Sequence, residues 1–542
     1  MNERFGWMST DARKNVVGGG ENGMFCNAIG KPAVALLLLA VVAFLAGCAS
    51  IPKDYQDYPR SSSTAFQGHA DTVMGRYLAE AAGRHPGESG FSIIRDGRTA
   101  FTARVALTEL AEKSLDVQYF IWEADETGRI LAERLLRAAD RGVRVRVLLD
   151  DINIHGRDAV VAAMDAHPNI EIRLFNPFAY RGFPGFEYLS NFNRVNHRMH
   201  NKLMVADNAV AIVGGRNIGN HYFEVSTDAN FRDLDIAAGG PVVREISSVF
   251  DHFWNGPWAV PVAALSDRPY TETDLRTAFE AVRKRISDDG YPYPIDRKVS
   301  DLKTRLTAIF DGFIWAHGSI VWDDPAAIVA AGKTQTMLES LHRRVDRLER
   351  ELLVESPYFI PRDRAIQKLK ALRERGVRVR VLTNSLASTD VIAAYAGYAN
   401  RRKQFLDTGA ELYELRPSAG SISKRFAAMT GSKAALHAKV LVFDRKDVFV
   451  GSFNLDPRSA DINTEAGLYV ESPELAEQVA AFMEDGVSPL QSYRVLLDDD
   501  GKLYWLAEVD GREVRLDEDP ETSFWQRLQA GFIGLLPIEE QL

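Results

Sequence analysis

The body of the chain alternates short apolar runs with longer stretches of helical periodicity. Residues 115–121 form a β-branched and aromatic run typical of a strand, a helical pattern follows at 127–141, and a second strand-like run occupies 143–149. Strands that alternate with helices predict a mostly parallel sheet covered by helices on both faces. The pattern therefore predicts an α/β fold.

The same pattern occurs a second time. Residues 353–360 predict a strand that leads into a helix ending at Arg375, and another strand follows it. The octapeptide Arg-Gly-Val-Arg-Val-Arg-Val-Leu occurs verbatim at 141–148 and at 375–382. An internal repeat of this size predicts two structurally equivalent α/β/α sandwich lobes.

Changes of pattern around the repeat divide the chain into six segments. We predict a signal peptide at 1–48, a tether at 49–70, an N-terminal lobe at 71–262, an inter-lobe connection with helices at 263–330, a C-terminal lobe at 331–487, and a β-meander with an amphipathic tail at 488–542. The apolar side chains of this tail are compatible with a membrane surface or with docking onto the body.

Each repeat contains one histidine, a lysine two residues later and an aspartate five residues after the lysine. The two copies of this H-x-K-x4-D pattern are His200-Lys202-Asp207 and His437-Lys439-Asp444. We expect both segments to be strands, on which residues two apart point to one face, so that a ligand meeting the histidine also meets the lysine. All six residues form our candidate catalytic set, although the odd spacing of the aspartates favours a role in fixing the fold.

An apolar run after each motif ends in a glycine turn with an asparagine. The turns are Gly214-Gly215-Arg216-Asn217 and Gly451-Ser452-Phe453-Asn454. We predict substrate contacts from Asn217 and Asn454 and from Gly215 and Ser452 beside them. The serine would offer a hydroxyl to a phosphate on one side only. The alternative for the asparagines is that they only form turns, where asparagine is favoured in any case.

Each motif histidine also needs a carboxylate that orients its ring. The strands after the two glycine turns align on a shared proline, and this alignment puts Asp233 opposite Glu465. We predict that these two are the orienting carboxylates. Asp235 and Asp228 remain alternatives for the first, and an ordinary solvated charge at a strand edge remains an alternative for both.

Two imidazoles, two ammoniums and two amides around one centre suit a phosphodiester. Lysine and asparagine donors can hold its non-bridging oxygens. One histidine can attack phosphorus while the other protonates the leaving alkoxide, so that the displacement proceeds in two steps through a phosphohistidine. Imidazole titrates near neutral pH, which makes both protonation states accessible.

The doubled motif and its glycine turns resemble the phospholipase D superfamily. Residues 198–202, 214–219 and 358–361 are similar, within it, to bacterial cardiolipin synthases of the C type, over roughly residues 60–540. The resemblance implies the phospholipase D fold with one active site at the pseudo-two-fold interface of the lobes, and no metal or other cofactor. It implies His200 as nucleophile and His437 as acid. It also implies phosphatidyl transfer, with phosphatidylglycerol as the acceptor in cardiolipin synthesis, or hydrolysis to phosphatidic acid with water as the acceptor.

Composition and charge limit the classes of molecule that the chain is expected to bind. The chain has 542 residues, 46% of them hydrophobic, and a net charge of −9, which argues against a generic nucleic-acid binder. We expect phospholipids and a membrane as partners and no nucleic acid, and the oligomeric state stays open. Aromatic and basic loops at 176–188 and 418–435 suit a lipid as lids, unless they only pack on each other. The alternatives are a nuclease or other phosphodiesterase with the same residues, and a non-catalytic envelope lipoprotein.

The N-terminal segment predicts export. A basic residue precedes the apolar run 32–44, which leads to Leu-Ala-Gly-Cys48, and this ending resembles the bacterial lipobox. We expect lipidation at Cys48 in a bacterial cell envelope, facing the periplasm, with Ala49 favouring the outer membrane. A plain membrane anchor is the alternative. The other cysteine, Cys26, also precedes the body, so the body has no disulfide framework.

Overall fold

The computed structural model describes residues 55–154, 157–179, 181, 184–289, 299–326, 336–418 and 432–542. These residues belong to one compact unit, Ser50–Leu542. The predicted signal peptide, with Cys26 and Cys48, and the first part of the tether lie outside the described residues, as does most of the loop 418–435. Within the described part of the chain, no helix is both long enough and apolar enough to span a membrane.

Two lobes are built around one continuous 18-stranded sheet. The strands of the first lobe are β1 (Ser89–Ile94), β2 (Ser114–Tyr119), β3 (Arg144–Asp150), β4 (Ile170–Phe175), β5 (Leu203–Ala206), β6 (Val210–Gly214), β8 (Asp235–Gly239) and β9 (Ala259–Pro261). Those of the second lobe are β11 (Glu351–Glu355), β12 (Arg378–Asn384), β13 (Glu411–Leu415), β15 (Val440–Phe443), β16 (Asp447–Gly451), β17 (Ala466–Glu471), β18 (Ser492–Leu497), β19 (Leu503–Val509) and β20 (Arg512–Leu516). The predicted β-meander is confirmed as β18–β20, and β18 also extends the lobe's sheet by pairing with β13.

The sheet is mixed rather than mostly parallel. In each lobe three neighbouring strands are parallel, β2–β3–β4 and β11–β12–β13. The motif strands β5 and β15 run antiparallel to their neighbours β2 and β11, and each enters a tight hairpin with the next strand. His200 and Lys202 lie just before β5, and His437 and Lys439 just before β15. The expectation that these four residues lie within strands is therefore wrong.

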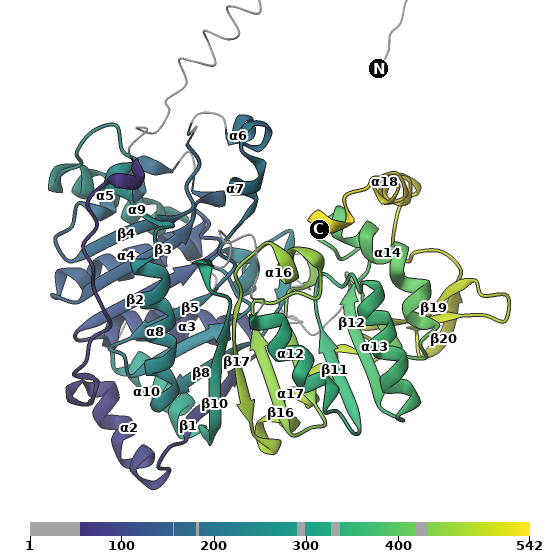
Figure 1. Ribbon diagram of the computed structural model, residues 1–542. Coiled ribbons are helices and arrows are strands. Elements are labelled where there is room, and N and C mark those ends of the chain that lie inside the picture. The colour runs from purple at the N-terminus through teal and green to yellow at the C-terminus, as the bar shows by residue number, and fades with distance from the viewer. Residues whose placement is uncertain are drawn as a thin grey trace, which may run out of the picture. The chain divides into compact units, whose positions relative to one another are not determined.

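A strand of the inter-lobe connection joins the two halves of the sheet. β10 (Ile314–Trp322) pairs with β1 through its first three residues and with β17 through the rest. Figure 1 shows it between β1 and β17, in the middle of the molecule. The sequence predicted helices in this connection, and α9 (Glu272–Asp289) and α10 (Val299–Asp311) are present. The sequence repeat gave no indication of β10, although β10 is the structural counterpart of β1: it pairs antiparallel with β17 as β1 does with β8.

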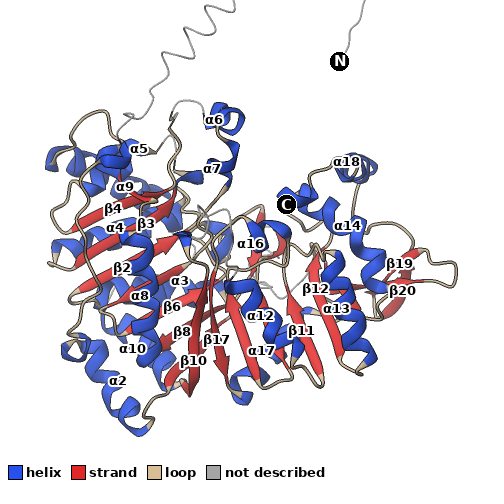
Figure 2. Ribbon diagram, in the orientation of Figure 1, coloured by secondary structure: helices blue, strands red, loops and turns tan. Residues whose placement is uncertain are grey.

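Helices cover both faces of the sheet in each lobe (Figure 2). The larger ones are α2 (Val73–Arg84), α3 (Gly97–Leu110), α4 (Glu126–Asp140), α5 (Asp158–Asp165) and α8 (Pro241–Asn255) in the first lobe, and α12 (Thr336–Asp346), α13 (Asp363–Glu374), α14 (Ile392–Leu406) and α17 (Pro473–Gly486) in the second. Each lobe has an outer apolar core of its own, and a third core, which includes α8 and α17, contains side chains of both lobes. The predicted fold class, two duplicated α/β/α lobes, is confirmed.

The verbatim octapeptide has a local structural cause. α4 is capped at its start by Asp125, whose carboxylate accepts the backbone N–H of Gly128, and at its end by Arg141. Gly142 then adopts φ +91°, the left-handed conformation that ends many helices. The second copy ends the same way, with Gly376 at φ +80° after α13. In both lobes this turn leads directly into a buried strand of the parallel set.

The remaining α-helices and strands of the described residues are shorter or lie outside the layers of helices named above. They are α6 (Pro184–Ser190), α7 (Phe192–Asn196) and β7 (Ala229–Arg232) in the first lobe, and β14 (Lys433–Leu436), α16 (Pro457–Asp461) and the C-terminal α18 (Phe524–Gly534) in the second. β7 and β14 form a separate two-stranded parallel sheet, with one strand from each lobe. The two lobes are thus joined by β10 and also directly beside the motif residues.

Candidate active site

Two short pairings between the lobes fix the backbone of both motif histidines. The N–H of His437 donates to the carbonyl of Arg232 at 2.8 Å, at the end of the β7–β14 pair. On the other side Met199 forms a single bridge with Thr464, and the N–H of His200 donates to the carbonyl of Thr464 at 2.9 Å. Each histidine is therefore held by the residue that precedes the other lobe's candidate carboxylate.

The two histidines and the two predicted carboxylates form crossed pairs. Nδ1 of His200 lies 2.9 Å from Oε2 of Glu465, and Nδ1 of His437 lies 2.7 Å from Oδ2 of Asp233. In each pair the imidazole comes from one lobe and the carboxylate from the other. An Nδ1–H that donates to a carboxylate leaves Nε2 as the reactive nitrogen. Neither lobe alone contains a complete pair.

Burial makes the two pairs electrostatically unequal. Burial and the charge of Lys439 lower the pKa of His437 to about 4, so its ring is neutral in the unliganded site near pH 7. Burial works against ionisation of Asp233, but His437 and Lys439 outweigh it and lower the pKa of the carboxyl to about 2. Burial raises the pKa of Glu465 to about 7, against the opposing charge of Lys202. Of these two paired carboxylates, Asp233 is the fixed anion near neutral pH.

The two lysines bring buried positive charge to the same centre. Nζ of Lys202 donates to the carbonyl of His200, and Nζ of Lys439 donates to the carbonyl of His437. Burial lowers the pKa of both ammoniums, to about 8 for Lys439, and the charge of Lys439 further lowers the pKa of Lys202. A phosphodiester anion bound between them would offset this mutual repulsion.

The two predicted asparagines have different surroundings. The side-chain oxygen of Asn217 accepts the N–H of Ile121 at 3.1 Å, and its amide donates to the hydroxyl of Tyr222 at 3.0 Å. Its amide is thus engaged within the first lobe, which favours the turn-forming alternative. Asn454 is buried, yet its side-chain oxygen has no hydrogen-bond partner among the described residues. It therefore remains the better candidate for a substrate contact.

Gly215 and Ser452 are matched to the carboxylates of their own lobes. A Cβ atom at Gly215 would lie 2.2 Å from Oδ1 of Asp233, so a side chain there would displace the carboxylate. The hydroxyl of Ser452 donates to Oε2 of Glu465 and accepts the N–H of Ala466. The expected hydroxyl contact to phosphate is therefore corrected, because this hydroxyl already positions a carboxylate.

We expect Gly215→Ala to lower kcat by about 100-fold, because a displacement of about 1 Å in a catalytic group has an effect of this order. The reciprocal change Ser452→Gly removes one hydrogen bond to Glu465 but does not push the carboxylate out of place. We expect it to lower kcat by about tenfold. Steady-state kinetics of both variants, with thermal unfolding as the check on folding, tests the prediction. Equal losses in the two folded variants would contradict it.

The aspartates that close the two motifs hold the backbone. Asp207 and Asp444 open the tight turns after β5 and β15, with φ of 54° and 51°, a conformation that aspartate tolerates. The carboxylate of Asp207 accepts the N–H groups of residues 112–114, and that of Asp444 accepts those of residues 349–351. We therefore remove both from the candidate catalytic set and treat them as residues that fix the fold.

The alternatives for Asp233 are placed elsewhere. Asp235 forms buried ion pairs with Arg104 at 2.9 Å and Arg216 at 3.3 Å. The backbone carbonyl of Asp228 accepts the N–H of Lys433 beside the β7–β14 pair. Among the described carboxylates, Asp233 and Glu465 are the ones that accept a hydrogen bond from a motif imidazole.

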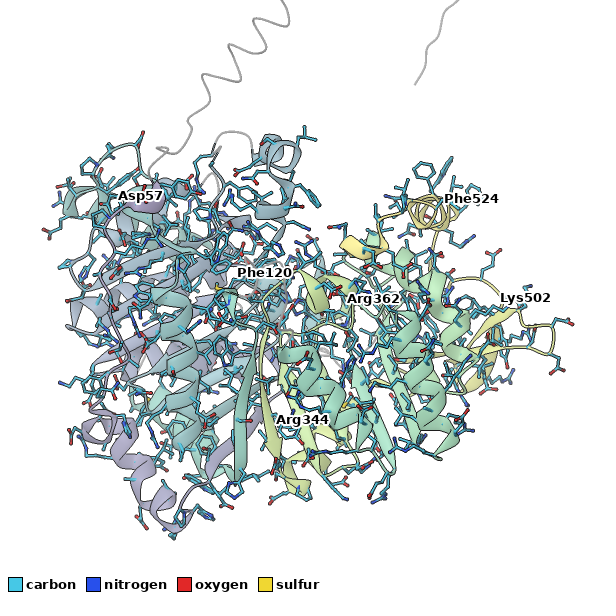
Figure 3. The ribbon with its side chains drawn as sticks, in the orientation of Figure 1. Asp57, Phe120, Arg344, Arg362, Lys502 and Phe524 are labelled. Carbon is cyan, nitrogen blue, oxygen red and sulfur yellow. The ribbon has the colours of Figure 1, made fainter. Side chains whose placement is uncertain are left out.

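Aromatic rings that the sequence reasoning missed pack against the imidazoles. Phe120 meets the ring of His200 edge-on at 4.8 Å between centroids, and Tyr222 meets that of His437 in the same way at 5.0 Å. Nζ of Lys202 lies 5.2 Å from the centre of the Phe120 ring, and Figure 3 shows Phe120 near the boundary of the two lobes. The available signal was its place directly after β2, at the edge where the parallel strands of the lobe end.

The arrangement supports two-step displacement at a phosphodiester. Burial and the charge of Lys202 also lower the pKa of His200 well below its usual value. The site thus provides two neutral imidazoles with oriented Nε2 atoms, one fixed anion beside His437, and two buried ammoniums for the phosphate oxygens. No group of three or more His, Cys, Asp or Glu side chains in the described ranges is arranged to hold a metal ion. The chain's own residues supply a nucleophile, a proton carrier and hydrogen-bond donors to the phosphate oxygens.

Comparison with known proteins identifies relatives over most of the chain. A family model described as "Cardiolipin synthase, PLD-like domain" matches residues 105–254 and 341–485. Cardiolipin synthase C of Escherichia coli (strain K12) is 38% identical over 463 residues, which cover 84% of this chain and 97% of that protein. An uncharacterized protein of Helicobacter pylori (strain ATCC 700392 / 26695) is 30% identical over 506 residues, 93% of this chain and 99% of that protein.

A solved structure has the same fold at much lower sequence similarity. The phosphatidylserine synthase of Haemophilus influenzae Rd KW20 aligns with a TM-score of 0.54 and 15% identity, covering 86% of this chain and all of that one. At this identity the likeness concerns the fold alone. Both lobes contribute to it, since the alignment spans most of this chain.

Proposed function

The chain belongs to the phospholipase D-like family of cardiolipin synthases, and on that premise we propose that it makes cardiolipin with phosphatidylglycerol as the acceptor. It is a transphosphatidylase, an enzyme that moves a phosphatidyl group from one alcohol to another. The crossed His–carboxylate pairs carry the proposal, because they bring two imidazoles to one centre, one hydrogen-bonded to Glu465 and the other to Asp233.

In the first step Nε2 of His200 attacks the phosphorus of the donor lipid. The bond from phosphorus to the headgroup oxygen breaks, and His437 protonates the leaving alkoxide, which leaves a phosphatidyl group on His200. His437 must carry a proton to do this. The bound phosphate anion offsets the charge of Lys439, which holds the pKa of His437 down in the free site.

In the second step His437, now neutral, takes the proton of the acceptor hydroxyl. The acceptor oxygen attacks phosphorus, the phosphorus–nitrogen bond breaks and His200 is released. The ionised carboxylate of Asp233 stabilises the imidazolium that His437 becomes. With the terminal glycerol hydroxyl of phosphatidylglycerol as acceptor the product is cardiolipin, and with water it is phosphatidic acid.

The proposal is tested by lipid analysis of a bacterial host that lacks its own cardiolipin synthases. Expression of the chain is expected to restore cardiolipin, and expression of its His437→Ala variant is not. If both raise cardiolipin equally, the assignment is wrong. Incubating the purified chain with headgroup-labelled phosphatidylglycerol or with plasmid DNA separates action on phospholipid from a nuclease, since release of labelled glycerol with intact DNA is the expected result.

We also propose that the chain is exported and lipid-anchored through Cys48 in the cell envelope. The support is the apolar run ending in Leu-Ala-Gly-Cys48. Metabolic labelling with a radioactive fatty acid is expected to mark the native chain and not the Cys48→Ala variant. Equal labelling of both would contradict the anchor.

A further inference from the structure

The C-terminal helix α18 turns its large apolar residues outward. Phe524, Trp525 and Phe532 are 63%, 72% and 65% exposed, and Leu528 between them is 51% exposed. Within the helix only Ala530 is buried. A helix of a soluble body normally buries its large apolar side chains and exposes its polar ones. Here the small residue faces the body and the large ones face outward.

This helix is held in place by definite contacts. Ser523 and Gln526 form a reciprocal cap at its first turn. Its last glycine lies against α14, where the side chain of Asn400 donates to the carbonyl of Gly534. Leu535, just beyond the helix, is 83% exposed and continues the apolar surface. The outward orientation thus belongs to a capped and docked helix.

A second exposed apolar group lies on the first lobe. Leu189 on α6 is 86% exposed and Phe192 at the start of α7 is 42% exposed. Figures 1 and 2 show α6, α7, α16 and α18 on the same side of the molecule. Exposed apolar residues scattered singly need no explanation, but groups of this size on one side indicate an interaction surface.

Hydrogen bonds tie the two groups together. The amide of Asn196, the last residue of α7, donates to the side-chain oxygen of Gln541 at 2.8 Å. Arg458 of α16 donates to the side-chain oxygen of Asn196 at 2.8 Å, and its own backbone N–H donates to the carbonyl of Leu542. The C-terminal residues after α18 therefore bridge α7 of one lobe and α16 of the other.

The same elements lead directly to the active site. α7 ends four residues before His200, and the next residue, His197, forms a hydrogen bond through Nδ1 with the carbonyl of Ile462 just after α16. α16 itself lies between Asn454 and Glu465 in the chain. The exposed apolar groups thus flank the elements that carry the catalytic residues of both lobes.

We propose that Leu189, Phe192, Phe524, Trp525, Leu528, Phe532 and Leu535 form one docking face that inserts into the interface of a lipid bilayer. The inference rests on the proposed function, because a transphosphatidylase must reach phospholipids within a membrane. When the protein is docked in this way, α7 and α16 lead from the lipid-facing side of the protein to the active site. The face would act in addition to any anchor at the N-terminus.

The charges around α18 favour a lipid surface held by apolar contact. The helix carries one charged residue, Arg527, which pairs with Glu518 at 2.9 Å. The acidic residues near the C-terminus are paired as well, Glu539 with Arg401 and Glu540 with Arg362. Tryptophan and phenylalanine are the residues that settle at membrane interfaces. We therefore expect docking that depends little on salt and on the fraction of anionic lipid.

The functional test compares two forms of the same substrate. The variant Trp525→Glu with Phe532→Glu is expected to act at least tenfold more slowly on phospholipid vesicles, and at the native rate on a short-chain phospholipid dispersed as monomers. Ala79→Glu, on an exposed position of α2 at the far end of the view from α18 (Figure 1), is the matched control and should change neither rate.

Each other outcome has a definite meaning. A double variant with full activity on vesicles overturns the docking face. A double variant slowed equally on both substrates also overturns it, because the helix then supports the catalytic body instead. If the native chain acts on neither substrate, the proposed function fails, and the docking face is then decided by binding alone.

Binding is measured without catalysis. In a chain whose Cys26 and Cys48 are changed to serine, Leu528→Cys is the only thiol and takes an environment-sensitive fluorophore. Vesicles of phosphatidylethanolamine and phosphatidylglycerol should shift its emission to the blue at both 0.1 M and 0.5 M salt, and a label on Ala79→Cys should not respond. A shift that follows protein concentration without vesicles would assign the face to a second copy of the chain and overturn the proposal.

Discussion

Replacing His200 by alanine is expected to lower phosphatidyl transfer by about 1,000-fold or more and to leave no covalent intermediate. His437→Ala should lose transfer to about the same extent, because proton transfer by a positioned histidine contributes up to about 10,000-fold. The two variants should differ in which step fails. His200→Ala removes the atom that bonds to phosphorus, whereas His437→Ala removes only the proton carrier.

A donor lipid with a nitrophenolate leaving group separates the two roles. This group departs without protonation, so His437→Ala should still release it in the first step. The second step then stalls, because nothing takes the proton of the acceptor hydroxyl, and a phosphatidyl-enzyme should accumulate. Radiolabel in the phosphate would remain on the protein with the acid lability and base stability of a phosphohistidine. Labelling of His200→Ala and not of His437→Ala would reverse the assignment.

The repeat allowed the site to be predicted residue by residue but not its pairing. Aligning the two copies gives positions that are equivalent, and so Asp233 and Glu465 were found as a matched couple. Equivalence does not say which histidine each one meets. That choice depends on the β7–β14 pair and the Met199–Thr464 bridge, in which backbone of one lobe pairs with backbone of the other. Contacts formed across an interface leave no periodic pattern in either copy.

Equivalent positions also turned out to have different roles. Gly215 and Ser452 align in the sequence, yet one leaves space for the carboxylate of Asp233 and the other donates a hydrogen bond to Glu465. The shorter side chain, that of Asp233, occurs with Gly215, and the longer one, that of Glu465, occurs with Ser452. Sequence reasoning about one position at a time missed this compensation, because each residue has meaning only with its partner in the fold.

The fold was predictable where strands and helices alternate with clear periodicity, and less so elsewhere. β10 lies in a segment that the sequence predicted as a helical connection, although it is the second lobe's counterpart of β1 and joins the two halves of the sheet. His200 and Lys202 lie in irregular chain before β5, yet both lie against the ring of Phe120, so their closeness does not require the predicted strand. For the apolar face of α18 the sequence is compatible with a membrane or with the body, because periodicity shows a face but not what covers it.

Asp233→Asn is expected to lower kcat by about 1,000-fold, and Glu465→Gln by only about 10- to 100-fold. The carboxylate of Asp233 is ionised throughout the neutral range and lies 2.7 Å from Nδ1 of His437, so it stabilises the imidazolium that forms when this histidine takes a proton. A neutral amide cannot do so. Glu465, with its pKa raised to about 7, is already half protonated near neutral pH, and glutamine resembles that neutral form.

The difference between the two variants should therefore depend on pH. Above about pH 7 Glu465 becomes a carboxylate in the native enzyme, so the loss caused by Glu465→Gln should grow as the pH rises through 7 and shrink as it falls. The loss caused by Asp233→Asn should stay constant from pH 5 to 9, because the pKa of Asp233, about 2, lies far below that range. Profiles of kcat for the native chain and both variants measure this, with thermal unfolding at each pH as the control. A constant cost for Glu465→Gln across the range would show that the two crossed pairs are equivalent, and the assignment of His437 as the proton carrier would lose its electrostatic basis.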